Sequence, residues 1–420
     1  MVNYELNNHV KLHVIETKKY KNTTISVRLL LPLEEDKASS RSLLAMMMPN
    51  RTKNHPTVNA LTQYLDSNYG MGLTMNTFSI GSGHLFDIQC NAIDPFYIEG
   101  ESLLTKQVEM LQEVLWNPLV DENGFFDEDL WQEAKMILKS KIIRRMDDPS
   151  SFAIDLNNKL VGKGNTFAIS ALGNEEDVDA ITKESTKQAY LDLLSLSKVD
   201  VFVIGDVCSE EVYTLLSKYS FSNKKEPTPV DILYSWNERE MIEHEEEREI
   251  DQSIVILTWY TGIDFSDPLY YALKLGNIIL GGDSNSLMFK KIREENSYCY
   301  SVFSSIYSMD KILIGYAGIS YENKEATVSL MKEMMTRVQE GDFTDQLETA
   351  KLIYINSLRS QCDTKSGLLN FVYQQDLVAT SNTLENVIEK IQSVDKEQVM
   401  QAMRSCELIG EFVLKEKSHE

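Results

Sequence analysis

An arginine and a tyrosine seven positions apart, Arg293 and Tyr300, carry side chains that can donate hydrogen bonds to carbonyl oxygens. A guanidinium donates two parallel hydrogen bonds to oxygen acceptors, and a phenol donates to a carbonyl oxygen on which negative charge develops. Taken alone, the pair indicates nothing about function and is better explained as an exposed helix arginine and a strand tyrosine. The surrounding block, residues 279–304, decides between these interpretations.

This block reads ILGGDSNSLMFKKIREENSYCYSVFS. Two glycines end an apolar, helix-like run, a short amphipathic stretch leads to Arg293, and an alternating strand carries Tyr300. The block resembles the second domain of the pitrilysin/insulinase family of zinc peptidases, especially the half-size members of the mitochondrial processing peptidase type. In that family an Arg and a Tyr at this spacing hold the substrate peptide, so the resemblance implies the same role for Arg293 and Tyr300. One departure is Leu287, where the family often has Arg.

The resemblance also implies a zinc-binding helix with the motif His-x-x-Glu-His in the first half of the chain. Two imidazoles one helical turn apart would face one Zn²⁺, and the glutamate would activate the bound water. Counting back from Tyr69-Gly70, which resembles the family's Gly-Gly turn after that helix, the motif falls on Leu-Ala-Met-Met-Met at residues 44–48. These side chains offer no metal ligand and are expected in a core. The family's later glutamate ligand falls near Lys141, whose charge would repel zinc, so we expect neither metal nor another cofactor here.

Other catalytic groups are not indicated. Only two of the six histidines, His9 and His13, are four residues apart, and both are expected on a strand, too far from each other to share a metal. His244 lies in an acidic run without a second histidine, which favours a solvated charged segment. Cys299 has no histidine near it in the sequence and is expected to be a small packing residue. The six are His9, His13, His55, His84, His244 and His419.

Three pairs of segments indicate that one domain is present twice. Their offsets of 216, 227 and 213 residues are too similar for unrelated coincidences, so we expect a duplicated domain of roughly 200 residues. The matching segments are 134–137 with 350–353, 72–80 with 299–307, and 181–190 with 394–403.

Within each copy, strands and helices segregate instead of alternating one for one, which favours an α+β fold. We expect two homologous domains, each a mainly antiparallel sheet with helices on one face. The predicted boundaries are 1–221 for the first domain, 222–249 for an acidic, proline-containing linker, and 250–420 for the domain with the Arg/Tyr block. The resemblance implies that this pair of domains is half of a clam-shell.

The chain has 420 residues and a formal net charge of −23, with no basic stripe in the sequence. A polyanion would be repelled, so nucleic acid is not an expected partner. No apolar run approaches the length of a membrane span, and the N-terminus lacks the pattern of a signal peptide. Five widely spaced cysteines without a C-x-x-C pair fit a reducing compartment. We therefore expect a cytoplasmic protein without membrane partners.

The resemblance implies a heterodimer in which a sister subunit supplies zinc and His-x-x-Glu-His, while this chain, without activity alone, holds the peptide through Arg293 and Tyr300. The chain resembles the "probable inactive" half-size members that bacteria keep beside an active sister. Two alternatives stay open. One is a peptide-binding or scaffold pseudoenzyme that forms a homodimer, and the other is an independent enzyme, for which the sequence offers no site.

Overall fold

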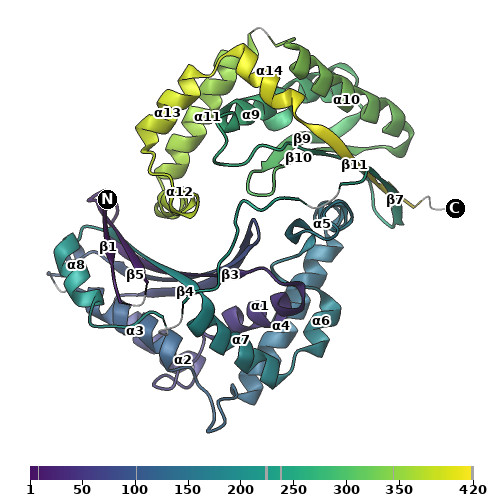
Figure 1. Ribbon diagram of the computed structural model, residues 1–420. Coiled ribbons are helices and arrows are strands. Elements are labelled where there is room, and N and C mark those ends of the chain that lie inside the picture. The colour runs from purple at the N-terminus through teal and green to yellow at the C-terminus, as the bar shows by residue number, and fades with distance from the viewer. Residues whose placement is uncertain (8, 101, 223–225, 237–238, 344, 418–420) are drawn as a thin grey trace. The chain divides into compact units, whose positions relative to one another are not determined.

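The computed structural model describes residues 1–7, 9–100, 102–222, 226–236, 239–343 and 345–417. The chain forms two compact units, each assembled from two segments. Unit 1 comprises Met1–Arg145 and Ile169–Asp231, and unit 2 comprises Met146–Ala168 and Ile232–Glu420. Each unit consists of one sheet with helices packed against it (Figure 1).

Unit 1 is built on a six-stranded sheet of order β1-β2-β6-β3-β5-β4, in which only the β2–β6 pair is parallel. Its core lies between this sheet and helices that include α1, α3 and α7. The strands are β1 (Val2–Glu5), β2 (Lys11–Glu16), β3 (Asn22–Pro32), β4 (Gly72–Ile80), β5 (Gly83–Ile93) and β6 (Lys198–Gly205). The helices are α1 (Glu35–Met47), α2 (Val58–Ser67), the 3₁₀ turn η1 (Pro95–Tyr97), α3 (Leu104–Trp116), α4 (Glu128–Asp147), α6 (Glu175–Ala180), α7 (Lys183–Leu196) and α8 (Ser209–Leu216).

Unit 2 is built on a five-stranded sheet of order β7-β11-β8-β10-β9, in which only β7–β11 is parallel. The strands are β7 (Ile242–Arg248), β8 (Ser253–Tyr260), β9 (Cys299–Tyr307), β10 (Ile312–Ile319) and β11 (Glu407–Glu416). The helices are α5 (Pro149–Val161), α9 (Tyr270–Asn277), α10 (Lys324–Glu340), α11 (Gln346–Cys362), α12 (Lys365–Leu377), α13 (Leu384–Ser393) and α14 (Lys396–Arg404). Shorter turns are the 3₁₀ turns η2 (Thr166–Ala168) and η5 (Tyr321–Asn323) and the π-helical η3 (Ile278–Gly282) and η4 (Phe289–Glu295).

The duplication inferred from the sequence is visible in the two sheets. The order β2-β6-β3-β5-β4 corresponds strand for strand to β7-β11-β8-β10-β9, including the one parallel pair. The three matched segment pairs lie on equivalent elements, since β4 corresponds to β9, α4 to α11 and α7 to α14. The last two helices also begin alike, because Thr182 and Asp395 each cap the backbone N–H three residues on.

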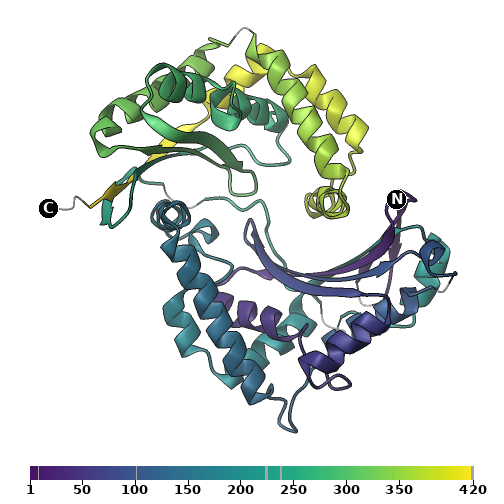
Figure 2. The same cartoon turned by 180° about the vertical axis from the view of Figure 1, so that it is seen from behind.

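The expected fold class, α+β with two homologous domains, is confirmed. One detail differs, because helices do not cover only one face of the second sheet. Its main core lies under α9, α10 and α14, whereas α5 packs on the opposite face against β8 and β11 (Figure 2). Residues 146–168 therefore belong to unit 2, although the sequence boundaries placed them in the first domain. Proximity along the chain could not reveal this assignment.

The segment 222–249 was expected to be a linker, and part of it is structured. Residues 242–248 form β7, the edge strand of the second sheet, in which half-buried and exposed side chains alternate. His244 lies on this strand, stacked on Phe412 and 3.3 Å from a Glu246 oxygen. The glutamate-rich run therefore forms a strand with a two-residue repeat, and its charged side chains lie on an exposed edge of the sheet. Residues 223–225 and 237–238 lie outside the described part.

Residues 232–236, at the start of the second segment of unit 2, are hydrogen-bonded to the turn between β9 and β10. Tyr234 donates its phenol hydrogen to the Asp310 carboxylate at 3.0 Å, and the Trp236 indole donates to the Asp310 carbonyl at 2.7 Å. Lys311 donates from Nζ to the backbone carbonyls of Leu233 and Tyr234. Burial raises the pKa of Asp310 to about 6, against the opposing effect of the Tyr234 hydrogen bond.

A pH-dependent stability follows from this carboxyl group. Because its pKa is raised in the folded state, its stabilising contribution is complete below pH 4 and is lost as pH rises through about 6. Asp310→Asn keeps an acceptor for Tyr234 without the buried charge, so the variant should match the wild type near pH 4 and exceed it at pH 7.5 by roughly 2 kcal/mol. Thermal unfolding at both pH values measures this. An equal effect at the two pH values would contradict the assignment.

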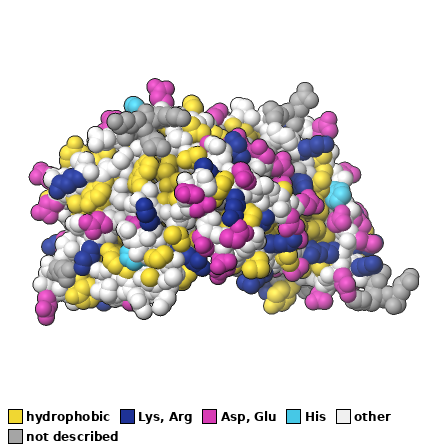
Figure 3. Space-filling model, turned by 90° about the horizontal axis from the view of Figure 1, so that it is seen from below, with side chains coloured by type: hydrophobic (Ala, Val, Ile, Leu, Met, Phe, Trp, Pro, Cys, Tyr) yellow, Lys and Arg dark blue, Asp and Glu magenta, His cyan; other side chains and the backbone are white. Residues whose placement is uncertain are grey.

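No helix among the described residues is long and apolar enough to cross a membrane. On the face of the molecule shown in Figure 3, basic side chains are interspersed with acidic ones.

Candidate functional site

Arg293 and Tyr300 are brought together by a tight reversal of the chain between η4 and β9. Arg293 lies near the end of η4, where its carbonyl accepts from the Ser297 N–H at 3.1 Å. Ser297 adopts a left-handed conformation with φ of 56°, and the next N–H, of Tyr298, donates to the Ile292 carbonyl. This backbone turn folds β9 back along the helix, so that the guanidinium carbon of Arg293 lies 5.6 Å from the centre of the Tyr300 ring.

Tyr300 is displayed at a β-bulge on an edge strand. β9 is the last strand of its sheet and pairs only with β10. Its register with β10 shifts between Gly318 and Ile319, which pair with Ser301 and Cys299, so the intervening Tyr300 has no partner residue. Bulges redirect a side chain and are frequent near functional sites. The Tyr300 side chain is 78% exposed, the free edge of β9 lies beside it, and an extended peptide could pair with that edge.

The two glycines of the block lie in close packing, and at Gly281 a side chain would clash with backbone. A Cβ on Gly281 would lie 2.8 Å from both the backbone N and the Oγ of Ser304 on β9, and one on Gly282 would lie 3.1 Å from the Asn277 side chain. Asn277 and Ser304 are also joined by hydrogen bonds of 3.2 and 3.4 Å. Helix η3 can therefore lie directly against β9, which fixes the strand that carries Tyr300.

Arg293 lies against aromatic rings and has no acidic partner in the part of the chain that the structure describes. Its guanidinium carbon lies 4.7 Å from the Phe289 ring, one helical turn earlier. Among the described residues it forms no ion pair, so its donors are available to a ligand. The neighbouring Cys299 is buried, and burial raises the pKa of its thiol to about 11, against a smaller opposing effect of Arg293. This agrees with a packing role, since a nucleophile must be a thiolate.

A cavity of about 330 Å³ lies between the same block and the N-terminal turns of α11. Asp283, Ser286 and Lys290 line one side, and Asp345 and Thr349 line the other. Neither Arg293 nor Tyr300 lines this cavity. The pair, an exposed Tyr300 beside a half-buried Arg293, is therefore separate from this cavity.

The position expected for a zinc helix is part of the core of unit 1. Leu44, Met47 and Met48 lie at the end of α1 and are at most 1% exposed. They belong to the apolar cluster between the helices and the sheet. No nitrogen or oxygen ligand is present in these side chains, and water cannot reach them. A zinc ion bound through His-x-x-Glu-His therefore does not fit at this position.

The histidines are dispersed. His9 lies in a turn with φ of 61°, outside any strand, contrary to the sequence expectation, while His13 lies on β2 as expected and is 3.5 Å from Asp200. His55 pairs with Glu113 at 3.0 Å. His84 is fully buried in β5, and burial, with Arg41 nearby, lowers its pKa to about 3, so it stays neutral. His419 lies outside the described residues.

The chain purified alone should contain no stoichiometric zinc, because Leu44, Met47 and Met48 supply no ligand and Lys141 lies exposed on α4, where a carboxylate ligand was expected. Elemental analysis after dialysis measures this. A control sample dialysed with added zinc and then treated with a mild chelator separates tight from loose binding. About one zinc per chain that survives the chelator would contradict the expectation.

Comparison with known proteins places these observations in a family. The profile described as "Peptidase M16 inactive domain" matches residues 180–354. A Bacillus subtilis protein named "Probable inactive metalloprotease YmfF" is 28% identical over 411 residues, covering 96% of this chain and 95% of that protein.

Two crystal structures extend the likeness to the whole fold. A conserved protein from Enterococcus faecalis has a TM-score of 0.93 at 24% identity, covering 100% of this chain and 99% of the other. A peptidase M16 inactive domain from Pseudomonas fluorescens has a TM-score of 0.82 at 16% identity, covering 100% and 99%.

A duplicated α+β domain with apolar residues at positions 44–48 thus matches homologues of zinc peptidases, including ones whose names describe them as inactive. The chain is similar to the pitrilysin/insulinase (M16) peptidase family, as the Arg/Tyr block indicated, and resembles proteins described as inactive.

Proposed function

We propose that this chain is the non-catalytic subunit of a two-subunit zinc peptidase. In this proposal Arg293 and Tyr300 bind the substrate peptide, and a sister subunit supplies zinc and His-x-x-Glu-His. The observation that supports the proposal most is the arrangement of Tyr300, displayed by a bulge on a free strand edge beside an arginine without an acidic partner among the described residues. The position expected for the metal is filled by buried core side chains, whereas Arg293 and Tyr300 are present together at the strand edge. This combination fits a chain that binds the peptide but does not supply the zinc.

Each group has a defined task in this proposal. The edge of β9 offers backbone hydrogen bonds to an extended peptide. The Arg293 guanidinium holds peptide carbonyl oxygens, and the Tyr300 hydroxyl donates to the carbonyl under attack, where charge develops. We place this work in the cytoplasm, in keeping with five free cysteines, four of them buried.

Co-expression tests the proposal. The chain is produced with a similar-length neighbour that carries His-x-x-Glu-His, and purified through a tag on this chain. We expect a 1:1 complex with about one zinc per pair that cleaves a quenched fluorescent peptide library, whereas each chain alone does not. A sister with Gln in place of its motif glutamate is the matched inactive control. Equal cleavage by the sister alone would contradict the proposal.

The alternative function is a peptide-binding scaffold that acts without a sister, either as a single chain or as a homodimer. It needs only the exposed pair on the edge of β9. The same purification distinguishes it, because a scaffold would bind peptide alone and would not retain the sister.

A further inference from the structure

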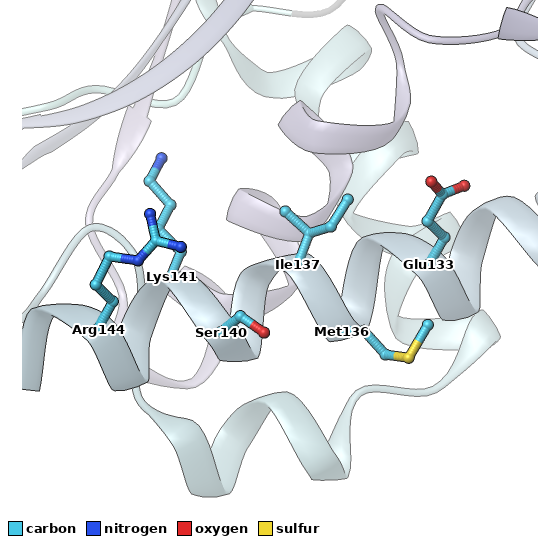
Figure 4. Close-up of a pocket in the computed structure, with 6 residues that line it drawn as sticks. All are labelled: Glu133, Met136, Ile137, Ser140, Lys141 and Arg144. Carbon is cyan, nitrogen blue, oxygen red and sulfur yellow. The ribbon is translucent and has the colours of Figure 1, made fainter.

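One face of α4 in unit 1 is a separate feature that the proposed function does not use. It borders a cavity of about 490 Å³ lined by Glu133, Met136, Ile137, Ser140, Lys141 and Arg144. In Figure 4 the side chains of Ile137, Lys141 and Arg144 point to the same side of the helix, and the two cationic groups lie next to each other. The cavity thus has a cationic end and an apolar middle.

The basic residues of α4 divide into two kinds. Lys139 pairs with the Asp179 carboxylate at 2.7 Å, and Lys135 donates to the Ile181 carbonyl at 3.1 Å. Lys141 and Arg144, in contrast, form no hydrogen bond or ion pair with any described residue. Like charges one turn apart on a helix repel each other. In a chain of net charge −23, two adjacent cations without an acidic partner are a place that an anion would stabilise.

The other residues that line the cavity indicate which kind of anion would bind there. Ile137, one turn before Lys141, is 49% exposed, and Met136 is 65% exposed. An ion held only by charge would gain nothing from these apolar groups. Glu133, a further turn away, lies 3.7 Å from Arg51 and would repel a second negative charge while accepting from an N–H donor. The face therefore offers cations for one carboxylate, an apolar surface beside them, and an acceptor beyond.

We propose that this face of α4 binds the C-terminal carboxylate of a peptide that ends in an apolar residue. The last residue of such a peptide carries a carboxylate and an apolar side chain on one Cα, and these two groups are about as far apart as neighbouring turns of a helix. The backbone N–H groups of the peptide lie further from the carboxylate. Lys141 and Arg144 hold the carboxylate, Ile137 and Met136 contact the last side chain, and Glu133 faces the preceding N–H groups. This proposal rests on the proposed function in one respect, namely that the ligand is a peptide. The site on α4 lies in a different unit from Arg293 and Tyr300.

The test uses the exposed methyl group of Met136 as a reporter. The full chain is labelled with ¹³C at the methionine methyls, and the Met136 signal is assigned by its loss in Met136→Leu. It is titrated with Gly-Ser-Gly-Ser-Ala-Leu as the free acid, as the C-terminal amide, and with an amidated peptide that carries one internal Glu. We expect a saturable shift with the free acid and binding about tenfold weaker for the other two. Equal affinity for all three peptides, or no shift with the free acid, would overturn the proposal.

Variants locate the carboxylate. Lys141→Gln/Arg144→Gln should weaken free-acid binding about tenfold or more while leaving the amide unaffected. Lys159→Gln/Arg359→Gln makes the same charge change on α5 and α11 and should leave the affinity unchanged; equal losses in both double variants would reduce the effect to net charge and overturn the site. The Met136 shift should persist in Tyr300→Phe, so a failure of the peptidase proposal is distinguishable from a failure of this one.

Discussion

In the assembled pair, Tyr300→Phe should lower turnover about a hundredfold while leaving the affinity for peptide nearly unchanged. The hydroxyl acts where charge develops on the carbonyl under attack, so its loss is felt in the transition state and costs on the order of 3 kcal/mol. Arg293→Ala should weaken peptide binding and lower kcat/KM by the same factor while leaving kcat little changed, because a guanidinium on peptide carbonyls is used equally in the ground and transition states. Single-turnover cleavage and peptide binding, measured with the same peptide, separate the two effects.

Neither change should unfold the chain. Tyr300 is 78% exposed, and Tyr300→Phe removes one oxygen atom while leaving the ring beside Arg293. Arg293→Ala gives up its stacking on Phe289 and Tyr300, which is worth about 1 kcal/mol at a partly exposed site. Tyr97→Phe, at another exposed tyrosine, and Arg359→Ala on α11 are matched controls. Wild-type kcat/KM in both site variants would leave this chain as a scaffold.

The local patterns of the sequence were enough to predict much of the fold. The alternating strands 72–80 and 299–307 and the segments 134–137 and 350–353 lie on equivalent elements, because side-chain periodicity is a local property. β7 was missed because its alternating positions are occupied by glutamates, so that the pattern is one of charge and not of hydrophobicity. α5 was assigned to the wrong unit, because the sheet against which a helix packs is decided by contacts between residues that are distant in the sequence.

The same distinction applies to the candidate site. The spacing of Arg293 and Tyr300 pointed to the pair, and the spacing of Phe289 and Arg293, one helical turn, could have indicated their stacking. The bulge at Tyr300 depends on the register of Gly318 and Ile319 on another strand, which no local pattern carries. That Lys141 and Arg144 have no ion-pair partner in the described part of the chain is likewise a property of the folded structure.

The triple variant Leu44→His/Met47→Glu/Met48→His, which restores the zinc motif, should neither fold stably nor become an enzyme. All three positions are at most 1% exposed in the core of unit 1. Losing buried side chains of this size costs about 2–5 kcal/mol each, and an unpaired carboxylate at position 47 adds several more. The sum exceeds the roughly 5–15 kcal/mol by which a domain is stable. The later carboxylate ligand and the partners that orient the imidazoles are also missing.

Circular dichroism melting, zinc content and cleavage of the peptide library measure this outcome. Leu44→Met/Met47→Leu/Met48→Leu is the matched control, since volume-conserving exchanges in a core usually cost below about 1.5 kcal/mol each, and it should keep a cooperative melt. If the motif triple instead melted like this control, bound about one zinc and cleaved peptide, α1 would be a dormant metal site. Loss of the fold in the motif triple alone would show that the positions given up by the metal now hold unit 1 together, so that a return to catalysis would require rebuilding the core as well as the ligands.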